Sequence, residues 1–313
     1  MRIAIFGSGG SGGYFGARLA KAGERVIFIA RGNHLRAIRE NGLFVDSVEG
    51  DFVVKPAQAT DDPAETGVAD VVIVGVKTWQ VPEAAQAMRP LIGKETFVVP
   101  LQNGVEAPAQ LEAVLGPGRV LGGSARVLTF ISSPGRIRHL GGPATITFGE
   151  LDNRRSERAE RLRETFFRAG ISAEIPPDIQ AALWEKFLFI VPLGGIGAVT
   201  RAPVGTLRAF PETRRMLEQG MSEIHQVARG RKVSLPEEIV TKTMNFVDTL
   251  PPNGTFSLQR DILAGRPSEL EAWNGAVVRL GRPVEVATPL HEFLYGSLLP
   301  LERKARGQAS FPV

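Results

Sequence analysis

A run of small residues near the N-terminus, GSGGSGG at positions 7–13, constrains the fold more than any other feature of this sequence. An apolar segment at residues 2–6 precedes the run, and a helix-like segment, YFGARLAKAG, follows it. Strand, glycine-rich loop and helix in this order are the context in which G-x-G-x-x-G predicts a dinucleotide site. Gly7 would permit the tight turn, Gly9 would let the backbone approach a pyrophosphate, and Gly12 would let the helix pack closely on the strand. The alternative is a glycine-rich turn that binds nothing.

The loop and the end of the next apolar segment together predict the ligand. The start of the helix offers free N–H groups and a partial positive charge to phosphates. We therefore expect a dinucleotide to be bound by Gly7, Ser8, Gly9, Gly10, Ser11 and Gly12. An NAD site has an acidic residue about 20 positions further on to hold the ribose 2′-hydroxyl. The segment VIFIARGNH at 26–34 instead offers Arg31, whose guanidinium suits a 2′-phosphate. The sequence predicts NADP (NADPH), with a solvated surface arginine as the alternative.

Short apolar runs alternate with helical patterns through the first half of the chain, which is typical of parallel βαβ units. The predicted strands cover residues 2–6, 24–30, 68–75, 96–100 and 119–122. Two further segments, 136–140 and 144–149, are spaced as a hairpin or an antiparallel extension. A charged helix at 153–169 and a strand at 171–175 follow, and the patterns after the proline pair at 176–177 are helical.

This order of elements predicts two domains. We expect an α/β Rossmann domain at residues 1–175 that binds NADP, with a mostly parallel sheet and an antiparallel extension. An all-α helical domain at residues 176–313 would hold the substrate and the catalytic residues. The polar tail after Leu301 is expected to be loose.

Composition narrows the classes of function and of metal site. The sequence has no cysteine, which excludes disulfides, a thiolate nucleophile and Cys-ligated metals and fits a reducing compartment. The four histidines, at 34, 139, 225 and 291, are dispersed, so we interpret them as structural and predict no metal. The basic residues are scattered, which favours an anionic small molecule over nucleic acid. The uncharged run at 187–200 is too short and too broken to span a membrane. We expect a cytoplasmic protein and allow for a homodimer.

A lysine lies on the apolar face of a predicted helix. If residues 178–193 are helical at about 100° per residue, Ile179, Leu183 and Ile190 share one face, and Lys186 lies among them. Glu185 faces the other way. An ammonium group on a buried face needs a partner or loses its proton. Lys186 is therefore a candidate catalytic residue, and a lysine that extends along the helix to solvent is the alternative.

A glutamate lies in a similar position on a second predicted helix, which we expect to begin at Ser268. Ser268 and Glu271 fit an S-x-x-E capping box. Glu269 shares an apolar face with Trp273, and an acid that only stabilises the first helical turn is the alternative. Two inward-facing opposite charges would meet in a cleft, where a lysine beside a carboxylate can act as an acid toward a carbonyl oxygen.

Seven motifs point to one family. They are GSGGSGG at 7–13, Arg31, KTWQ at 77–80, QNG at 102–104, LWEK at 183–186, SLQRD at 257–261 and PSELEAWNG at 267–275. In this set and order the sequence resembles the ketopantoate reductase (2-dehydropantoate 2-reductase) family, which belongs to the two-domain superfamily of 6-phosphogluconate dehydrogenase. The resemblance implies a Rossmann domain followed by a helical domain with the active site between them. It also implies NADPH as hydride donor, a 2-keto acid as acceptor and a place in pantothenate biosynthesis.

The resemblance also implies roles for individual residues. Lys186 would be the general acid that protonates the carbonyl oxygen, and Glu269 would hold the lysine and hydroxyl groups of substrate or cofactor. The further binding residues would be Ser257 for the substrate carboxylate, Asn103 beside nicotinamide and substrate, and Lys77 and Gln80 along the cofactor. The alternatives are an exposed lysine and glutamine, an asparagine in a turn and a serine that caps a helix.

Two positions depart from the family pattern. Family members that act on ketopantoate usually carry asparagines one and two turns after the lysine, whereas this sequence has Ile190 and Gly194 there. Ile190 and Gly194 would therefore form an apolar, short wall of the substrate site. A more apolar 2-keto acid is the first alternative to ketopantoate. A different dehydrogenase on the same two-domain plan and a catalytically weak nucleotide-binding regulatory protein are the others.

Overall fold

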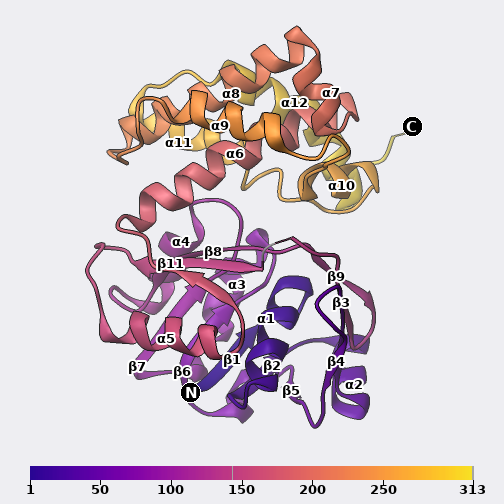
Figure 1. The fold of residues 1–313 in the computed structure, drawn as a ribbon, viewed down its shortest axis with the longest axis vertical. Coiled ribbons are helices and arrows are strands. Elements are labelled where there is room, and N and C mark those ends of the chain that lie inside the picture. Colours follow the sequence, from indigo (N-terminus) through magenta and orange to yellow (C-terminus); the bar gives the residue numbers. More distant parts are fainter. Residues whose placement is uncertain (143, 312–313) are drawn as a thin grey trace. The chain divides into compact units, whose positions relative to one another are not determined.

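The computed structural model describes residues 1–142 and 144–311 and divides the chain into two units, Met1–Gln180 and Ala181–Val313. All the described strands belong to the first unit, and the second unit is helical (Figure 1). The division falls within α6 (Ile179–Thr200) rather than at the proline pair, because Ile179 is bound to the first unit. The N–H of Ile179 donates to Asn153 Oδ1 at 3.0 Å, and its side chain fills the space beside Gly122.

A five-stranded parallel sheet forms the centre of the first unit. Its order is β5 (Gln58–Thr60), β2 (Arg25–Ile29), β1 (Arg2–Phe6), β6 (Ala69–Val74) and β7 (Ile92–Pro100). Ile3 and Ile5 of β1 belong to one buried core, and Ala4 and Phe6 belong to another on the opposite face. The first core includes residues of α1 (Gly10–Lys21), α2 (Gly32–Asn41) and α5 (Glu157–Arg168), and the second includes residues of α3 (Val81–Ala87) and α4 (Ala107–Leu115). Burial on both faces explains the continuous apolar runs that predicted these strands.

Two smaller sheets extend this unit. One has the order β4 (Phe52–Val54), β3 (Leu43–Ser47), β10 (Arg136–His139) and β9 (Thr129–Ser133). The other has the order β12 (Ser172–Glu174), β11 (Thr145–Glu150) and β8 (Leu121–Arg126). The antiparallel extension is confirmed, because β11 pairs antiparallel with β8. A hairpin between the segments at 136–140 and 144–149 is wrong, because β10 pairs instead with β9 and β3. The short helices of the unit are η1 (Pro63–Thr66), η2 (Thr78–Gln80) and η3 (Arg89–Leu91).

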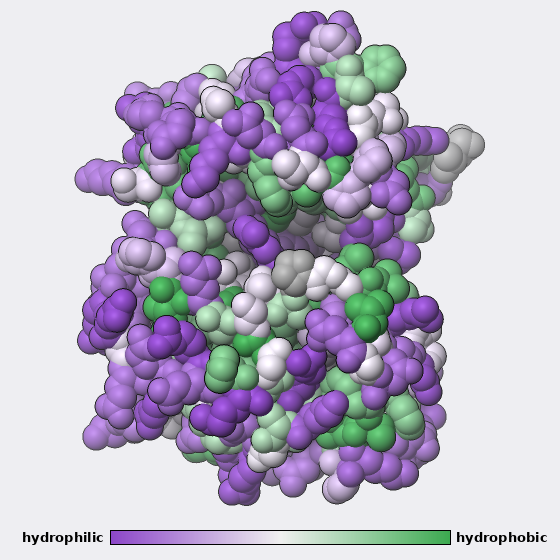
Figure 2. All heavy atoms as spheres, viewed as in Figure 1, coloured by the Kyte–Doolittle hydropathy of each residue, from purple (hydrophilic) through white to green (hydrophobic). Residues whose placement is uncertain are grey.

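The second unit packs its helices around α6. They are α7 (Val204–Ala209), α8 (Pro211–Gly230), α9 (Ile239–Thr249), α10 (Ser257–Leu263), α11 (Asn274–Gly281), η4 (Arg282–Val284) and α12 (Pro289–Ala305). By length and composition α6 could cross a membrane, but 78% of its apolar window is buried, as in the core helix of a globular unit. The expectation of a loose tail is wrong, since α12 continues past Leu301 and Glu302 is buried. The surface in view of both units is mainly hydrophilic (Figure 2).

Candidate functional site

The glycine-rich loop has the geometry that its glycines require. Gly7 has φ +98°, a region that residues with a side chain rarely adopt. The N–H groups of Gly7 and Ser8 both donate to the carbonyl oxygen of Ile29, at 3.2 Å each. A Cβ at Gly12 would collide with the carbonyl oxygen of Gly7. Glycine at position 12 is therefore what lets α1 start so close to β1.

The loop is open at Gly9. Gly9 is the N-cap of α1, and a Cβ added there would meet no atom within 4 Å. The first turn of α1 contains no acidic residue, and no side chain of the N-cap occupies its N–H groups. The free N–H groups of the first turn of α1 and the positive end of its helix dipole thus face the open space at Gly9. These features fit the pyrophosphate of a dinucleotide, which needs close backbone approach and N–H donors.

The other cofactor candidates of the first unit follow neighbouring strands. Arg31 follows β2, Lys77 and Gln80 follow β6, and Asn103 follows β7. Because β2, β1, β6 and β7 are adjacent and parallel, their carboxyl ends meet at one edge of the sheet. Ligands of open α/β sheets bind at that edge. The structure therefore gathers these residues and the glycine loop on one side of the first unit.

Arg31 lies at the N-cap of α2 with a largely exposed side chain. Its nearest acidic partner is Glu83 of α3, with Nη2 and Oε1 separated by 3.4 Å. Both side chains are about two-thirds exposed, at 65% and 69%, so this pair stabilises little. Arg31 is thus free to exchange a weak surface contact for a phosphate. Glu83 was not identified from the sequence, because it follows a different strand.

Lys77 and Gln80 form a closed turn just after β6. The N–H of Lys77 donates to Gln80 Oε1 at 3.2 Å, and the N–H of Gln80 donates to the Lys77 carbonyl at 2.9 Å. The Lys77 ammonium lies 5.8 Å from the centre of the Trp79 ring, which is 38% exposed. The turn therefore places the Lys77 ammonium and the Trp79 ring at the same edge of the sheet as the glycine loop.

Gln102 fixes the loop that carries Asn103. Its Nε2 donates to the carbonyls of Val74 at 3.0 Å and Val76 at 2.8 Å, which ties the end of β7 to the end of β6. Asn103 follows it half-buried, and Gly104 has φ +101°, so the chain turns sharply there. The sequence identified the QNG motif but not the role of Gln102, because its partners are backbone oxygens.

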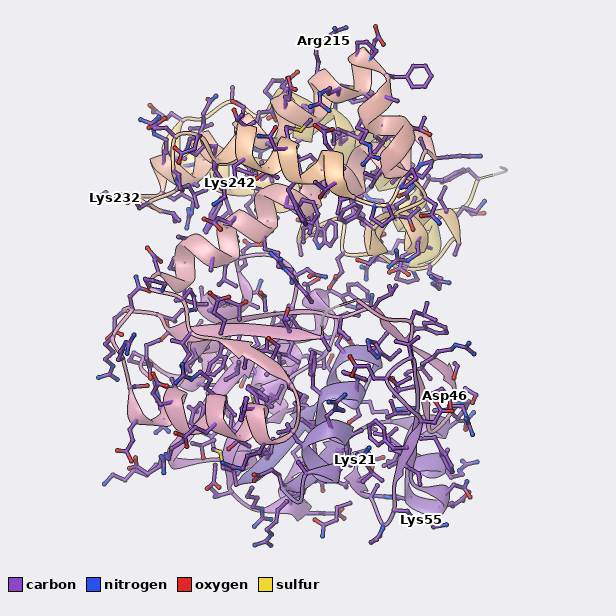
Figure 3. The ribbon with its side chains drawn as sticks, in the orientation of Figure 1. Lys21, Asp46, Lys55, Arg215, Lys232 and Lys242 are labelled. Atoms are coloured by element: carbon purple, nitrogen blue, oxygen red, sulfur yellow. The ribbon has the colours of Figure 1, made fainter. Side chains whose placement is uncertain are left out.

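Lys186 is buried, as its place on the helix predicted. The lysines labelled in Figure 3 at 55, 232 and 242 lie at the surface. Lys186 is 7% exposed on α6, while its neighbour Glu185 is only partly buried. Lysine is almost never buried to this degree unless it is paired. The low exposure of Lys186 supports its placement on the inward face of α6.

The predicted start of the helix at Ser268 is wrong, although Glu269 is buried. Residues 269–273 form turns, and α11 begins only at Asn274. One α-type turn forms, since the N–H of Trp273 donates to the Glu269 carbonyl at 3.0 Å. The capping box is also absent, because Glu271 instead binds Arg279 and the Tyr295 hydroxyl. Glu269 is nevertheless 7% exposed, as expected for an inward-facing carboxylate.

A carboxylate from the end of the chain holds the segment before Glu269. Glu302 accepts hydrogen bonds from the N–H of Ser268 at 3.0 Å and from its hydroxyl at 2.5 Å. Arg306 donates to Glu302 at 2.6 Å and to the Ser268 carbonyl at 3.0 Å. Ser268 is fully buried and Glu302 is 5% exposed. This clamp replaces the predicted capping box and fixes the residue next to Glu269.

The candidate substrate residues of the second unit lie on α6 and on α10, which packs against α6 through Leu258. Ile190 is 7% exposed one turn after Lys186. A Cβ at Gly194 would lie 2.7 Å from Trp273 Cζ3 and 3.4 Å from Leu258 Cβ. Trp273 thus fills the space that a side chain at 194 would need. Ser257, the first residue of α10 and the neighbour of Leu258, is partly buried.

Two family models match this chain. One is described as ketopantoate reductase PanE/ApbA and covers residues 3–153, and the other is described as its C terminal and covers residues 178–302. The chain is 32% identical to a 2-dehydropantoate 2-reductase from Mesorhizobium japonicum, over 92% of this chain and 94% of that one.

Solved structures agree with these matches. The crystal structure of a 2-dehydropantoate 2-reductase from Geobacter metallireducens GS-15 has a TM-score of 0.88 at 32% identity, over 96% of this chain and 99% of that one. The ternary structure of D-mandelate dehydrogenase with NADH and anilino(oxo)acetate has a TM-score of 0.89 at 22% identity, over 98% and 99%. The second likeness shows a shared fold.

Proposed function

The chain belongs to the ketopantoate reductase family and is an oxidoreductase of CH–OH groups, and on that premise we propose that it reduces 2-dehydropantoate (ketopantoate) to pantoate with NADPH. The burial of Lys186 on α6 is the observation that carries this proposal. Adding hydride to a ketone creates an alkoxide, so the reaction needs an acid held near a dry carbonyl oxygen. Lys186, a residue only 7% exposed, can supply that acid.

The first unit binds the cofactor in this proposal. The glycine loop holds the pyrophosphate through the N-terminus of α1, and Lys77, Gln80 and Asn103 lie along the rest of the molecule. Arg31 pairs with the 2′-phosphate, which explains why a basic residue, and not an acidic one, follows β2. When bound, NADPH supplies the hydride.

The second unit binds the acceptor and moves the proton. Lys186 donates a proton to the C2 oxygen of the keto acid as hydride reaches the C2 carbon, so the product is a hydroxyl group. Glu269 orients Lys186 and binds a hydroxyl of the substrate. Ser257 binds the substrate carboxylate through its hydroxyl at the start of α10. Glu302 and Arg306 keep Glu269 in place through Ser268.

A second candidate substrate is a 2-keto acid with a more apolar side chain. The packing of Trp273 against Gly194 supports it, because an indole ring fills the space that the asparagine implied by the family resemblance would need. Ile190 adds a second apolar residue on the same helix. The D-mandelate dehydrogenase bound to NADH and anilino(oxo)acetate has the same fold, so an aromatic 2-keto acid belongs in the test.

A substrate panel tests both candidates. We would follow the loss of NADPH absorbance with ketopantoate, 2-ketoisovalerate, 2-ketoisocaproate and benzoylformate, and repeat the series with NADH. The proposal expects ketopantoate to have the highest kcat/KM, whereas a preference for benzoylformate or 2-ketoisocaproate would favour the second candidate. Nucleotide binding without turnover of any keto acid would favour a regulatory protein. We propose the cytoplasm as the site of this reaction, and sedimentation of the purified protein would show whether it forms a homodimer.

A further inference from the structure

His34 connects the glycine-rich loop to a hairpin through both of its ring nitrogens. Its Nε2 lies 2.9 Å from the carbonyl oxygen of Ser8, in the middle of the loop. The N–H of Gly135, in the turn between β9 and β10, donates to His34 Nδ1 at 3.0 Å. An N–H donor at Nδ1 requires a lone pair there, so the proton of the neutral ring is on Nε2. Nε2–H therefore donates to Ser8.

The hairpin is itself firmly placed. The N–H of Phe44 in β3 donates to the Gly135 carbonyl at 2.9 Å, and Gly135 packs directly against Ala37 of α2. β9 passes over the start of α1, since a Cβ at Gly10 would lie 2.8 Å from the Thr129 carbonyl oxygen. The hairpin thus gives His34 a rigid second anchor beside the loop. Burial lowers the pKa of His34 although its bond to Ser8 raises it, which keeps the ring neutral in neutral solution.

The bond from His34 determines the direction of one N–H in the loop. Ser8 already donates its N–H and its hydroxyl to the Ile29 carbonyl, at 3.2 and 3.1 Å. In a planar trans peptide the carbonyl of one residue and the N–H of the next point in opposite directions. Holding the Ser8 carbonyl against His34 therefore aims the Gly9 N–H away from α2. That direction is needed if the Gly9 backbone is to approach a pyrophosphate.

We propose that His34 is a positioning residue for the cofactor, which presents the Ser8–Gly9 peptide to the pyrophosphate through its Nε2–H. The proposal rests on the proposed function, because it assumes that the glycine loop binds NADPH. Nδ1 does not face the loop, and its bond to Gly135 selects the tautomer that donates to Ser8. His34 acts only on cofactor binding and takes no part in the transfer of hydride or proton.

Three substitutions at position 34 separate the two bonds. Glutamine can place an N–H donor near the position of Nε2 and keep the bond to Ser8. Asparagine can place an acceptor near the position of Nδ1 and keep only the bond to Gly135. Leucine keeps neither bond. His225→Leu is the control, because His225 is a buried histidine on α8 in the second unit.

Direct titration of NADPH fluorescence, with no keto acid present, gives Kd for each variant. We expect His34→Leu and His34→Asn to raise Kd by about fivefold to tenfold, the usual effect of one neutral hydrogen bond. His34→Gln and His225→Leu should stay within about twofold of the wild type. At saturating NADPH, kcat should be the same in all of these variants while KM for NADPH follows Kd.

The outcomes separate this inference from the proposed function. Wild-type protein that binds NADPH, together with a His34→Leu variant of unchanged Kd, would overturn the role of His34 alone. A His34→Gln variant as weak as His34→Leu would also overturn it, since the Ser8 bond would then not matter. Wild-type protein that binds neither NADPH nor NADH would overturn both. Circular dichroism identifies an unfolded variant, and the two remaining substitutions at position 34 then decide the matter.

Discussion

Gly194→Ala should destabilise the protein even though alanine is the better helix former. In the interior of a helix, replacing glycine with alanine stabilises by about 1 kcal/mol when the added methyl meets nothing. The added Cβ at Gly194 would lie 2.7 Å from Cζ3 and 3.1 Å from Cε3 of Trp273. Both atoms belong to a rigid indole ring that is 1% exposed, so the ring cannot rotate away into solvent. Overpacking of this kind costs about 1–3 kcal/mol, so against the gain of about 1 kcal/mol in helix propensity the net loss is up to about 2 kcal/mol.

Gly296→Ala is the matched control for this prediction. Gly296 lies in α12, where a Cβ would meet no atom within 4 Å, so the same substitution should raise stability by up to about 1 kcal/mol. Calorimetry of both variants measures the shift in Tm. Trp273→Leu should relieve the clash, so Gly194→Ala should cost less in that background than in the wild type. A Gly194→Ala protein as stable as Gly296→Ala would refute the packing of Trp273 on Gly194 and the apolar wall inferred from it.

Three further predictions concern charge and protonation. Glu302→Ala should cost about 1–3 kcal/mol of unfolding free energy, because it removes the acceptor of the buried Ser268 N–H and hydroxyl, and chemical denaturation measures this. Arg31→Ala should weaken NADPH binding by about 1.5–3 kcal/mol and NADH binding far less in fluorescence titrations, and equal losses would contradict the role of Arg31. Burial lowers the pKa of His291 to about 4, although its bond to Gly220 raises it. Between about pH 6.5 and pH 4 His291 is protonated in the unfolded chain but not in the folded protein. The free energy of unfolding should therefore fall by about 3 kcal/mol over this range. His291→Gln should remove this part of the acid sensitivity.

The sequence predicted the central sheet well because its strands are buried on both faces. Strands β1, β2 and β6 and the second half of β7 contain continuous apolar runs, and such runs depend little on what packs against them. The missed strand β9 is exposed along almost its whole length, so it shows neither a continuous run nor an alternation. The missed strands β4 and β5 have three residues each, which is too short for any period to show.

The errors at the candidate site come from partners that are distant in sequence. Ser268 and Glu271 match the sequence pattern of a capping box, yet the Ser268 hydroxyl donates to Glu302, 34 residues away. The residues after Leu301 were predicted to form a loose tail because they are polar. In the structure Glu302 and Arg306 both bind Ser268, which is more than 30 residues away in the sequence. Lys186 was found because helical periodicity alone places it among apolar residues. His34 was interpreted as structural and its proposed role was not predicted, because its partners are main-chain atoms that leave no mark on the pattern of side chains.

The kcat of Lys186→Ala on the best 2-keto acid tests the central claim most directly. General acid catalysis contributes about 10²–10⁴-fold, so the account predicts a fall of about 10²-fold or more in kcat, with the Kd for NADPH nearly unchanged. Glu269→Ala should lower kcat and raise KM together, because it touches both lysine and substrate. Circular dichroism and the NADPH titration confirm that each variant is folded and binds cofactor. A folded Lys186→Ala enzyme that binds NADPH and keeps nearly full kcat would contradict the assignment of the buried lysine as the proton donor.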